Sequence, residues 1–456
     1  MRRFNFLIII SLLGACSPKL HLPHIDMPKE YISPHSQNHA KRISDEWWQV
    51  FQSPLLDTLE IIALQNNKDL KMAVSNIESS RYELAIARSE FLPEVEAEIE
   101  ANTKYQTLEG RDYELAIQPN ITWNVSLFGA LRHTVGAARA EILASEWAYE
   151  GVKLSLTVQV ATAYFSILQY RQSLDIARHS LKLRKESAAL IDSLSHYGMS
   201  TGLDLDQAQS LVYASQSDVE EYSRALDQTK FSLAVLLGKS SEYVMKMNWD
   251  TALKITSPPT DIPVGLPSDL LARRPDLMES WYELQAAAAK VGIARSNRFP
   301  SIALTTDGGL IGSTVKELFT SGYWSWGAAA QLAQPIFSFG RLKRKEQIAR
   351  VEYEDAVLEY EKSVLTALKE VESSLVGIST YKSQAKQYAE YVDANKRIAE
   401  LTMALYRNGM NNYLDVISTQ QTWYNSQMQL IGLISEQYIN YANLVMALGG
   451  GWQERD

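Results

Sequence analysis

The sequence EVEAEIEAN at residues 94–102 alternates carboxylate or amide side chains with apolar ones throughout. Because successive side chains of a β-strand point to opposite faces, a strand here has one polar and one apolar face. The polar face carries four carboxylates: Glu94, Glu96, Glu98 and Glu100. Residues 113–127 continue the alternation, with apolar side chains at the odd positions. The two stretches predict a strand pair at 94–127 with an acidic face.

The same unit returns in the second half of the chain. The octapeptide IARSEFLP at residues 86–93 is similar to IARSNRFP at residues 293–300. Three more landmarks recur in the same order: Gly129 with Gly340, Gly198-Met199 with Gly409-Met410, and Leu237-Gly238 with Leu448-Gly449. The first match is offset by 207 residues and the other three by 211, and such self-similarity predicts an internal duplication. A weaker alternation gives the second strand pair at 301–337, through Ile302, Leu304, Trp324, Trp326, Leu332 and Ile336.

Each strand pair precedes a long stretch with helical periodicity. Residues 137–197 hold one glycine and no proline, and residues 341–408 hold only Gly377. At about 1.5 Å per residue, each stretch predicts a helix roughly 90–100 Å long. The apolar stripe of the first helix is interrupted at Arg184. The second helix carries a coiled-coil seam through Val364, Leu368, Val371, Leu375 and Ile378.

These patterns predict the division of the chain. A signal peptide at 1–15 precedes a lipidated linker at 16–53. The first repeat, 54–238, has a helix, the strand pair and a helix hairpin at 130–238. A proline-rich linker at 239–268 leads to the second repeat, 269–449, with its helix hairpin at 340–448, and a tail at 450–456 follows.

The N-terminus has the layout of a bacterial secretion signal, with Arg2 and Arg3 before an apolar run at residues 6–13. The following Leu13-Gly14-Ala15-Cys16 resembles a lipoprotein box, which implies acylation of Cys16. Ser17, by resemblance to enterobacterial sorting rules, favours the outer membrane. The alternative is an ordinary signal peptide with a chance cysteine. Cys16 is the only cysteine, so no disulfide within the chain is expected.

The composition limits the class of partner. A formal charge of -9 argues against nucleic acid. No uninterrupted apolar run of about 18 residues follows the signal, so no transmembrane helix is expected.

Single-chain bacterial barrels begin at about eight strands, and four strands therefore need further copies; three copies would give twelve and an aqueous lumen. The lumen would be lined by the glutamates of residues 94–100. The alternative is a soluble sandwich with a solvated acidic face.

With these features, the chain resembles the TolC-type outer-membrane factor family, in the lipoprotein branch that serves resistance-nodulation-division efflux pumps. The resemblance rests on motifs in order along the chain: Trp47-Trp48, Asn67-Lys68-Asp69-Leu70, Phe91-Leu92-Pro93, Leu127-Phe128-Gly129, Leu266-Pro267-Ser268-Asp269, Arg274-Pro275-Asp276, Gln334-Pro335-Ile336-Phe337 and Ala447-Leu448-Gly449-Gly450-Gly451-Trp452.

The resemblance implies an α+β membrane protein and a homotrimer. Its four strands per chain would form a twelve-stranded outer-membrane barrel, and its long helices a periplasmic α-barrel. A periplasmic adaptor protein and an inner-membrane pump would open it to export drugs or metal ions. A type I protein-secretion duct and a non-conducting periplasmic scaffold are the alternatives.

No catalytic set emerges from the sequence. It lacks a Gly-rich phosphate loop, a nucleophile elbow and a zinc-protease helix, so we expect no enzyme and no cofactor beyond the lipid on Cys16. Four histidines stand in the proline-containing linker: His21, His24, His35 and His39. Their spacing could hold a metal, but a solvated linker is the default interpretation and no metal site is predicted.

The functional site is expected at the two helix-to-helix turns. By the family's pattern, Asp204 and Asp415 match gate-ring aspartates, Leu414 a hydrophobic constriction, and Tyr406 a gate-network tyrosine. Leu203 occupies the position in the first repeat that Leu414 has in the second. Asn411 stands where some members have an arginine and Ser418 where a second aspartate can stand, so Leu414 packing would hold more of the closure. The alternative is that both aspartates simply begin helices.

Overall fold

The structure, a computed structural model, describes residues 20, 23–32, 44–106, 110–249, 265, 267–320 and 324–451. Cys16, His21, His35 and His39 lie outside these residues. The chain forms two compact units, each built from three segments. The sheet unit comprises Met1–Ile25, Val74–Ala148 and Asp276–Ser363, and the helical unit comprises Asp26–Ala73, Tyr149–Pro275 and Val364–Asp456. Both sequence repeats contribute to both units, so the spatial division does not follow the duplication.

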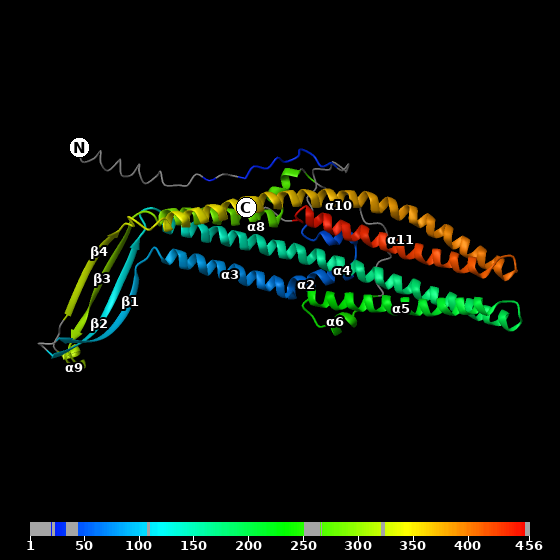
Figure 1. Ribbon diagram of the computed structural model, residues 1–456, viewed down its shortest axis with the longest axis horizontal. Coiled ribbons are helices and arrows are strands. Elements are labelled where there is room, and N and C mark those ends of the chain that lie inside the picture. Colours follow the sequence, from blue (N-terminus) through cyan, green and yellow to red (C-terminus); the bar gives the residue numbers. More distant parts are fainter. Residues whose placement is uncertain are drawn as a thin grey trace. The chain divides into compact units, whose positions relative to one another are not determined.

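The sheet unit contains one antiparallel sheet with strand order β1-β2-β3-β4 (Figure 1). Its strands are β1 (Glu94–Gln106), β2 (Gly110–Val125), β3 (Ser301–Gly312) and β4 (Trp324–Ala333). The register places Glu96 opposite Asn120, Asn120 opposite Asp307, and Asp307 opposite Gly327. One face is therefore polar across the first three strands and meets glycine on the fourth, as the alternation in residues 94–102 predicts for β1.

The last strand is shorter than expected, because β4 ends at Ala333 and Ile336 lies beyond it. Pro335 lacks the N–H that a further ladder bond would need. The Gln334 side chain donates instead to the carbonyl of Arg298 at 3.2 Å. A short helix, α9 (Val315–Thr320), which the sequence interpretation did not include, connects β3 to β4.

The expected helix before each strand pair is broken into two. The first repeat has α2 (Pro54–Asn66) and α3 (Lys68–Ser89), and Asn67 between them accepts a hydrogen bond from the Leu70 amide at 2.9 Å. The second repeat has α7 (Leu270–Arg273), after the 3₁₀ turn η3 (Pro267–Asp269), and then α8 (Pro275–Ser296). Pro275 disfavours helical geometry at Arg274, which ends α7.

The long helices have equal lengths in the two repeats. Two have 67 residues, α4 (Ala130–His196) and α10 (Arg341–Arg407), and two have 35, α5 (Gly202–Leu236) and α11 (Tyr413–Ala447). The short α6 (Ser241–Met245) follows α5. Among the described helices, α4 alone is long and apolar enough by composition to cross a membrane, with a best window of mean hydropathy 1.3 that is 50 % buried. The window qualifies through its average composition, and half of it is buried within the structure.

An aromatic cluster fills the core of the helical unit. The 3₁₀ turn η2 (Trp47–Phe51) buries Trp47, Trp48 and Phe51. The Phe51 ring lies 4.9 Å from that of Phe165 and 5.2 Å from that of Tyr441. The side chains of Trp47, Trp48 and Phe51 thus belong to the core, although the sequence interpretation placed these residues in a linker. Their burial depends on partners more than 100 residues away, which local periodicity does not reveal.

The end of each helix hairpin is fixed by the same contact in both repeats. Asn67 donates to the carbonyl of Leu236 at 2.9 Å, and Arg274 donates to the carbonyl of Ala447 at 2.8 Å. The next glycines, Gly238 and Gly449, both have positive φ, 61° and 87°. A Cβ atom would lie 2.4 Å from the Asn66 carbonyl oxygen at Gly238, and 2.6 Å from the Arg273 carbonyl oxygen at Gly449. This paired contact explains why glycine recurs there.

Candidate functional site at the helix tips

The two turns that join the long helices have the same backbone geometry. Gly198 and Gly409 both have a φ of 69°. The Met199 amide donates to the Leu194 carbonyl at 2.9 Å, and the Met410 amide donates to the Leu405 carbonyl at 3.0 Å. These bonds form a Schellman motif, in which a left-handed residue satisfies the last carbonyls of a helix. We call residues 197–204 and 408–415 the tip turns.

In the first tip turn, Asp204 is held by a capping box with Thr201. Its amide donates to the Thr201 hydroxyl at 3.1 Å, and its carboxylate accepts from the Thr201 amide at 3.0 Å and hydroxyl at 2.7 Å. Ser200 donates to the same carboxylate at 3.1 Å. These hydrogen bonds hold the pKa of Asp204 below its usual value, and the two from Thr201 have the largest effect. Asp204 therefore stabilises the first turn of α5, which is the structural role that the alternative interpretation gave it.

The second tip turn leaves its aspartate in a different environment. Asn412 caps α11 by accepting from the Asp415 amide at 2.9 Å, and the Asn411 side chain accepts from the Asn412 amide at 2.9 Å. The Asp415 side chain is exposed, and no described residue hydrogen-bonds its carboxylate. Asn411 thus shapes the backbone of the turn. Of the two aspartates, Asp415 is the one whose carboxylate is exposed and makes no hydrogen bond to a described residue.

A buried cluster holds the four helix ends together. Its core is formed by Ile191 of α4, Ala208 of α5, and Tyr413 and Val416 of α11, and Tyr406 of α10 packs against it. The rings of Tyr406 and Tyr413 lie 5.5 Å apart. Burial, with the nearby Tyr406, raises the pKa of Tyr413 to about 12. We call these five residues the tip cluster.

The predicted gate residues therefore separate into two groups. Tyr406 packs against the tip cluster, where burial raises its pKa and the charge of Asp204 adds to that shift. Leu203 and Leu414 are 66 % and 61 % exposed in the single chain, so the packing expected of Leu414 is not made within it. Sequence reasoning missed Tyr413, the buried neighbour of Leu414. The Thr-x-x-Asp pattern at Thr201 was a readable sign of the capping box.

The other predicted residues lie away from the tips. The side chains of Glu94, Glu96, Glu98 and Glu100 are exposed on the polar face of the sheet. Of the four linker histidines, only His24 is described, and its amide donates to Glu361 at 3.2 Å. Within the described part of the chain, no group of three or more His, Cys, Asp or Glu side chains could hold a metal ion.

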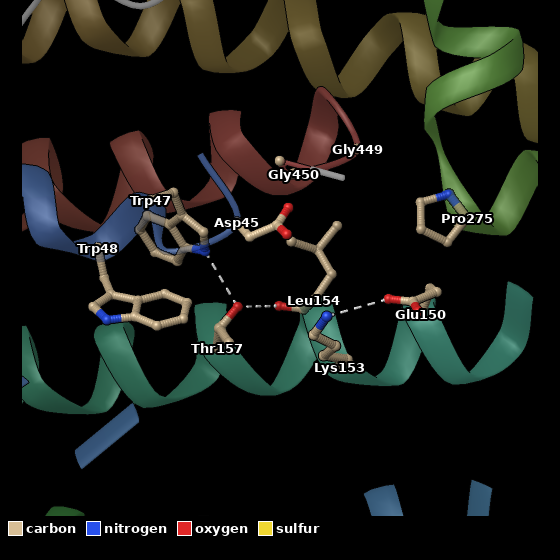
Figure 2. Close-up of a pocket in the computed structure, with 11 residues that line it drawn as sticks. Asp45, Trp47, Trp48, Glu150, Lys153, Leu154, Thr157, Pro275, Gly449 and Gly450 are labelled. Atoms are coloured by element: carbon tan, nitrogen blue, oxygen red, sulfur yellow. Dashed lines mark hydrogen bonds and ion pairs between the residues drawn. The ribbon is translucent and has the colours of Figure 1, made fainter. Parts of the chain in front are cut away.

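The helical unit also contains a pocket beside the aromatic turn η2 (Figure 2). Trp47 donates to the Thr157 hydroxyl at 3.2 Å, and Thr157 donates to the Leu154 carbonyl at 2.9 Å. On the same helix, α4, Lys153 lies 3.5 Å from Glu150. Trp47 is thus paired with Thr157, and Lys153 with Glu150. The hydrogen bond from Trp47 to Thr157 therefore fixes η2 against α4.

The capping box makes stability at the tip depend on pH. We expect Asp204→Ala to lower the free energy of unfolding by about 0.3–1.5 kcal/mol. Because the folded-state pKa is depressed, the carboxylate stabilises the fold above its unfolded pKa of about 3.9, and this is lost as pH falls through the folded pKa. Thermal unfolding of wild type, Asp204→Ala and the control Asp415→Ala, at about pH 7 and pH 3, measures it. An equal loss in Asp415→Ala at neutral pH would contradict the assignment.

The chain is similar in sequence to a family of known proteins. A family model described as "Outer membrane efflux protein" matches residues 62–239 and again 266–450, which confirms the duplication. The toluene efflux pump outer membrane protein TtgI of Pseudomonas putida is 33 % identical over 411 residues, covering 89 % of this chain and 87 % of the relative. The cation efflux system protein CusC of Escherichia coli is 28 % identical, covering 98 % of each chain.

Solved structures agree with the fold. A membrane protein from Pseudomonas aeruginosa matches with a TM-score of 0.84 and 27 % identity, covering 96 % of this chain and 98 % of that one. The CmeC outer membrane channel of Campylobacter jejuni matches with a TM-score of 0.89 and 22 % identity, covering 97 % and 96 %. The four strands and long helices per chain confirm the predicted fold class, and the family consists of channel proteins rather than enzymes. This chain belongs to the outer membrane efflux protein family.

Proposed function

We propose that three copies of this chain form one passive outer-membrane duct. The observation that carries the proposal is the four-stranded sheet, in which β1 and β4 are edge strands among the described residues. In lipid, every backbone polar group needs a partner and no edge can stay open. Three such sheets joined edge to edge give twelve strands, within the range of barrels that enclose an aqueous lumen.

The two faces of the sheet suit lumen and lipid. Val95, Ile99 and Trp326 are apolar strand residues that are 66 %, 77 % and 73 % exposed in the single chain. Contact with the hydrocarbon of a membrane is favourable for such side chains, whereas exposing a contiguous patch of them to water is unfavourable. The glutamates of residues 94–100 then line the lumen, where their charges favour cations over anions.

The lipid anchor fits the described start of the chain. Leu20 packs against the sheet-unit cluster that includes Val291 of α8 and Tyr353 of α10. Cys16 precedes it by four residues, so an extended tether spans at most about 14 Å. An acylated Cys16 would therefore hold the lipid close to these helices, in the outer membrane.

The gate is proposed at the tip turns, and the chain is proposed to act with a periplasmic adaptor and an inner-membrane pump. Exposed Leu203, Leu414 and Asp415 are the groups that would meet their copies near a threefold axis. Relatives are described as components of toluene, solvent, antibiotic and cation efflux pumps. We therefore propose small molecules, drugs or metal ions, as cargo in preference to proteins.

The test is the mass of the purified protein in detergent, combined with single-channel recording in a planar bilayer under a salt gradient. We expect a trimer with small currents and a reversal potential that shows cation preference. The double variant Glu96→Gln/Glu98→Gln should lower that preference, whereas the matched pair Glu220→Gln/Glu221→Gln, exposed on α5, should not. A monomer, or anion preference in the wild type, would overturn the duct or its acidic lumen, respectively.

A further inference from the structure

A buried arginine lies among three helices near the tips. Arg184 of α4 is only 5 % exposed. Its Nη1 donates to the Leu211 carbonyl of α5 at 3.3 Å, and its Nη2 donates to the Gln421 side chain of α11 at 2.5 Å. Its guanidinium carbon lies 5.7 Å from the ring centre of Tyr424, also on α11. We call these contacts the Arg184 bridge.

The contacts of the bridge are of two kinds. The bond to Leu211 stays within the α4–α5 hairpin, while those to Gln421 and Tyr424 cross to α11. The Gln421 amide is itself oriented, because its nitrogen donates to Asn425 at 2.8 Å and leaves its oxygen for the guanidinium. A guanidinium keeps its charge and has five N–H donors. Moving α11 away would therefore leave a buried charge without these acceptors, which is costly.

The bridge lies close to the tip cluster along each helix. Arg184 precedes Ile191 by two helical turns on α4, or about 10 Å. On α5, Leu211 follows Ala208 by one turn, and on α11 Gln421 follows Val416 by between one and two turns. Any motion that separates the α10–α11 tip from the α4–α5 tip must therefore also act on the bridge.

We propose that Arg184 is a positioning residue of the gate: its bridge to Gln421 and Tyr424 holds α11 against the α4–α5 hairpin, and the duct opens only when the bridge breaks. The inference rests on the proposed function, a gate at the tip turns. It adds a second point of closure inside each chain, independent of contacts between copies at the tips.

The experiment records single-channel conductance of the purified full-length protein and of its variants. Gln421→Leu removes the acceptor and keeps the side-chain volume, and Arg184→Met removes the donors and keeps an unbranched stem. We expect each to raise the open-state occupancy about tenfold, the effect of losing one charged hydrogen bond on an equilibrium. Their combination should add little, because both remove the same bond. Arg178→Met, an exposed arginine on the same helix, should leave it unchanged.

The outcomes separate the bridge from the gate. If Gln421→Leu forms a trimer with wild-type occupancy while Asp415→Ala raises it, the gate stands and the bridge is overturned. A lower unfolding midpoint without any rise in occupancy shows a structural role only and also overturns it. If neither the wild type nor any variant conducts, the proposed duct fails, and the bridge fails with it.

Discussion

Replacing Gly238 by alanine is expected to lower the free energy of unfolding by about 2–5 kcal/mol, through left-handed strain and overpacking together. The residue has a φ of 61°, and an added Cβ would lie 2.4 Å from the Asn66 carbonyl oxygen. A backbone carbonyl cannot rotate away as a side chain does, so the contact between α2 and the end of α5 must open. Circular dichroism during thermal unfolding measures the loss, and Gly449→Ala should behave alike.

The matched control is Gly409→Ala in the tip turn. Gly409 has a similar φ of 69°, but apart from its own atoms and its two chain neighbours no described atom lies within 4 Å of the point that a Cβ would occupy. It should therefore show the conformational cost alone, about 1–2 kcal/mol. Equal effects at Gly238 and Gly409 would mean that the close approach to Asn66 contributes nothing.

Replacing Tyr413 by alanine is expected to open the duct. Tyr413 is 5 % exposed, and its ring packs in the tip cluster that joins helices of both hairpins. Truncating a buried aromatic side chain costs about 3–5 kcal/mol, here taken from the packing that holds the tips together. Single-channel recording should show a larger conductance, and thermal unfolding a lower midpoint.

Two further variants of the second tip turn sharpen this prediction. Tyr413→Phe keeps the ring and should conduct like the wild type. Leu414→Ala truncates a side chain that is 61 % exposed in the chain and should change stability by less than about 0.5 kcal/mol. A large conductance in Leu414→Ala with none in Tyr413→Ala would show that closure depends on contacts between copies and not on the tip cluster.

Local periodicity explains what could be predicted from sequence. The alternation in residues 94–102 predicts which side chains share a face, because period two is a property of any strand. The register then extends that face to the neighbouring strands through pairs such as Asn120 with Asp307. The long helices follow in the same way from stretches without proline, and α4 begins at Ala130, where the sequence places the start of the first helix hairpin.

The sequence predicts the position of the candidate site in the chain, but not the environment of each of its side chains. The repeated glycine turns at Gly198 and Gly409 place it at the ends of the long helices. Their aspartates look equivalent in sequence, yet Asp204 is bound in a capping box and the Asp415 carboxylate is exposed. The difference arises because the Thr201 amide donates to the Asp204 carboxylate, whereas the Asn412 amide donates to the Asn411 side chain.

By itself, the sequence determined the duplicated strand-and-helix unit, the two-faced sheet and the position of the turns, since each is written in spacings of a few residues. Only the tertiary structure decided that the aromatic side chains of η2 enter the core, that Tyr413 rather than Leu414 is buried, and that Arg184 reaches Gln421. These are contacts between segments separated by up to several hundred residues. They depend on which helices pack together, and the apolar periodicity of one helix does not predict which other helix packs against it.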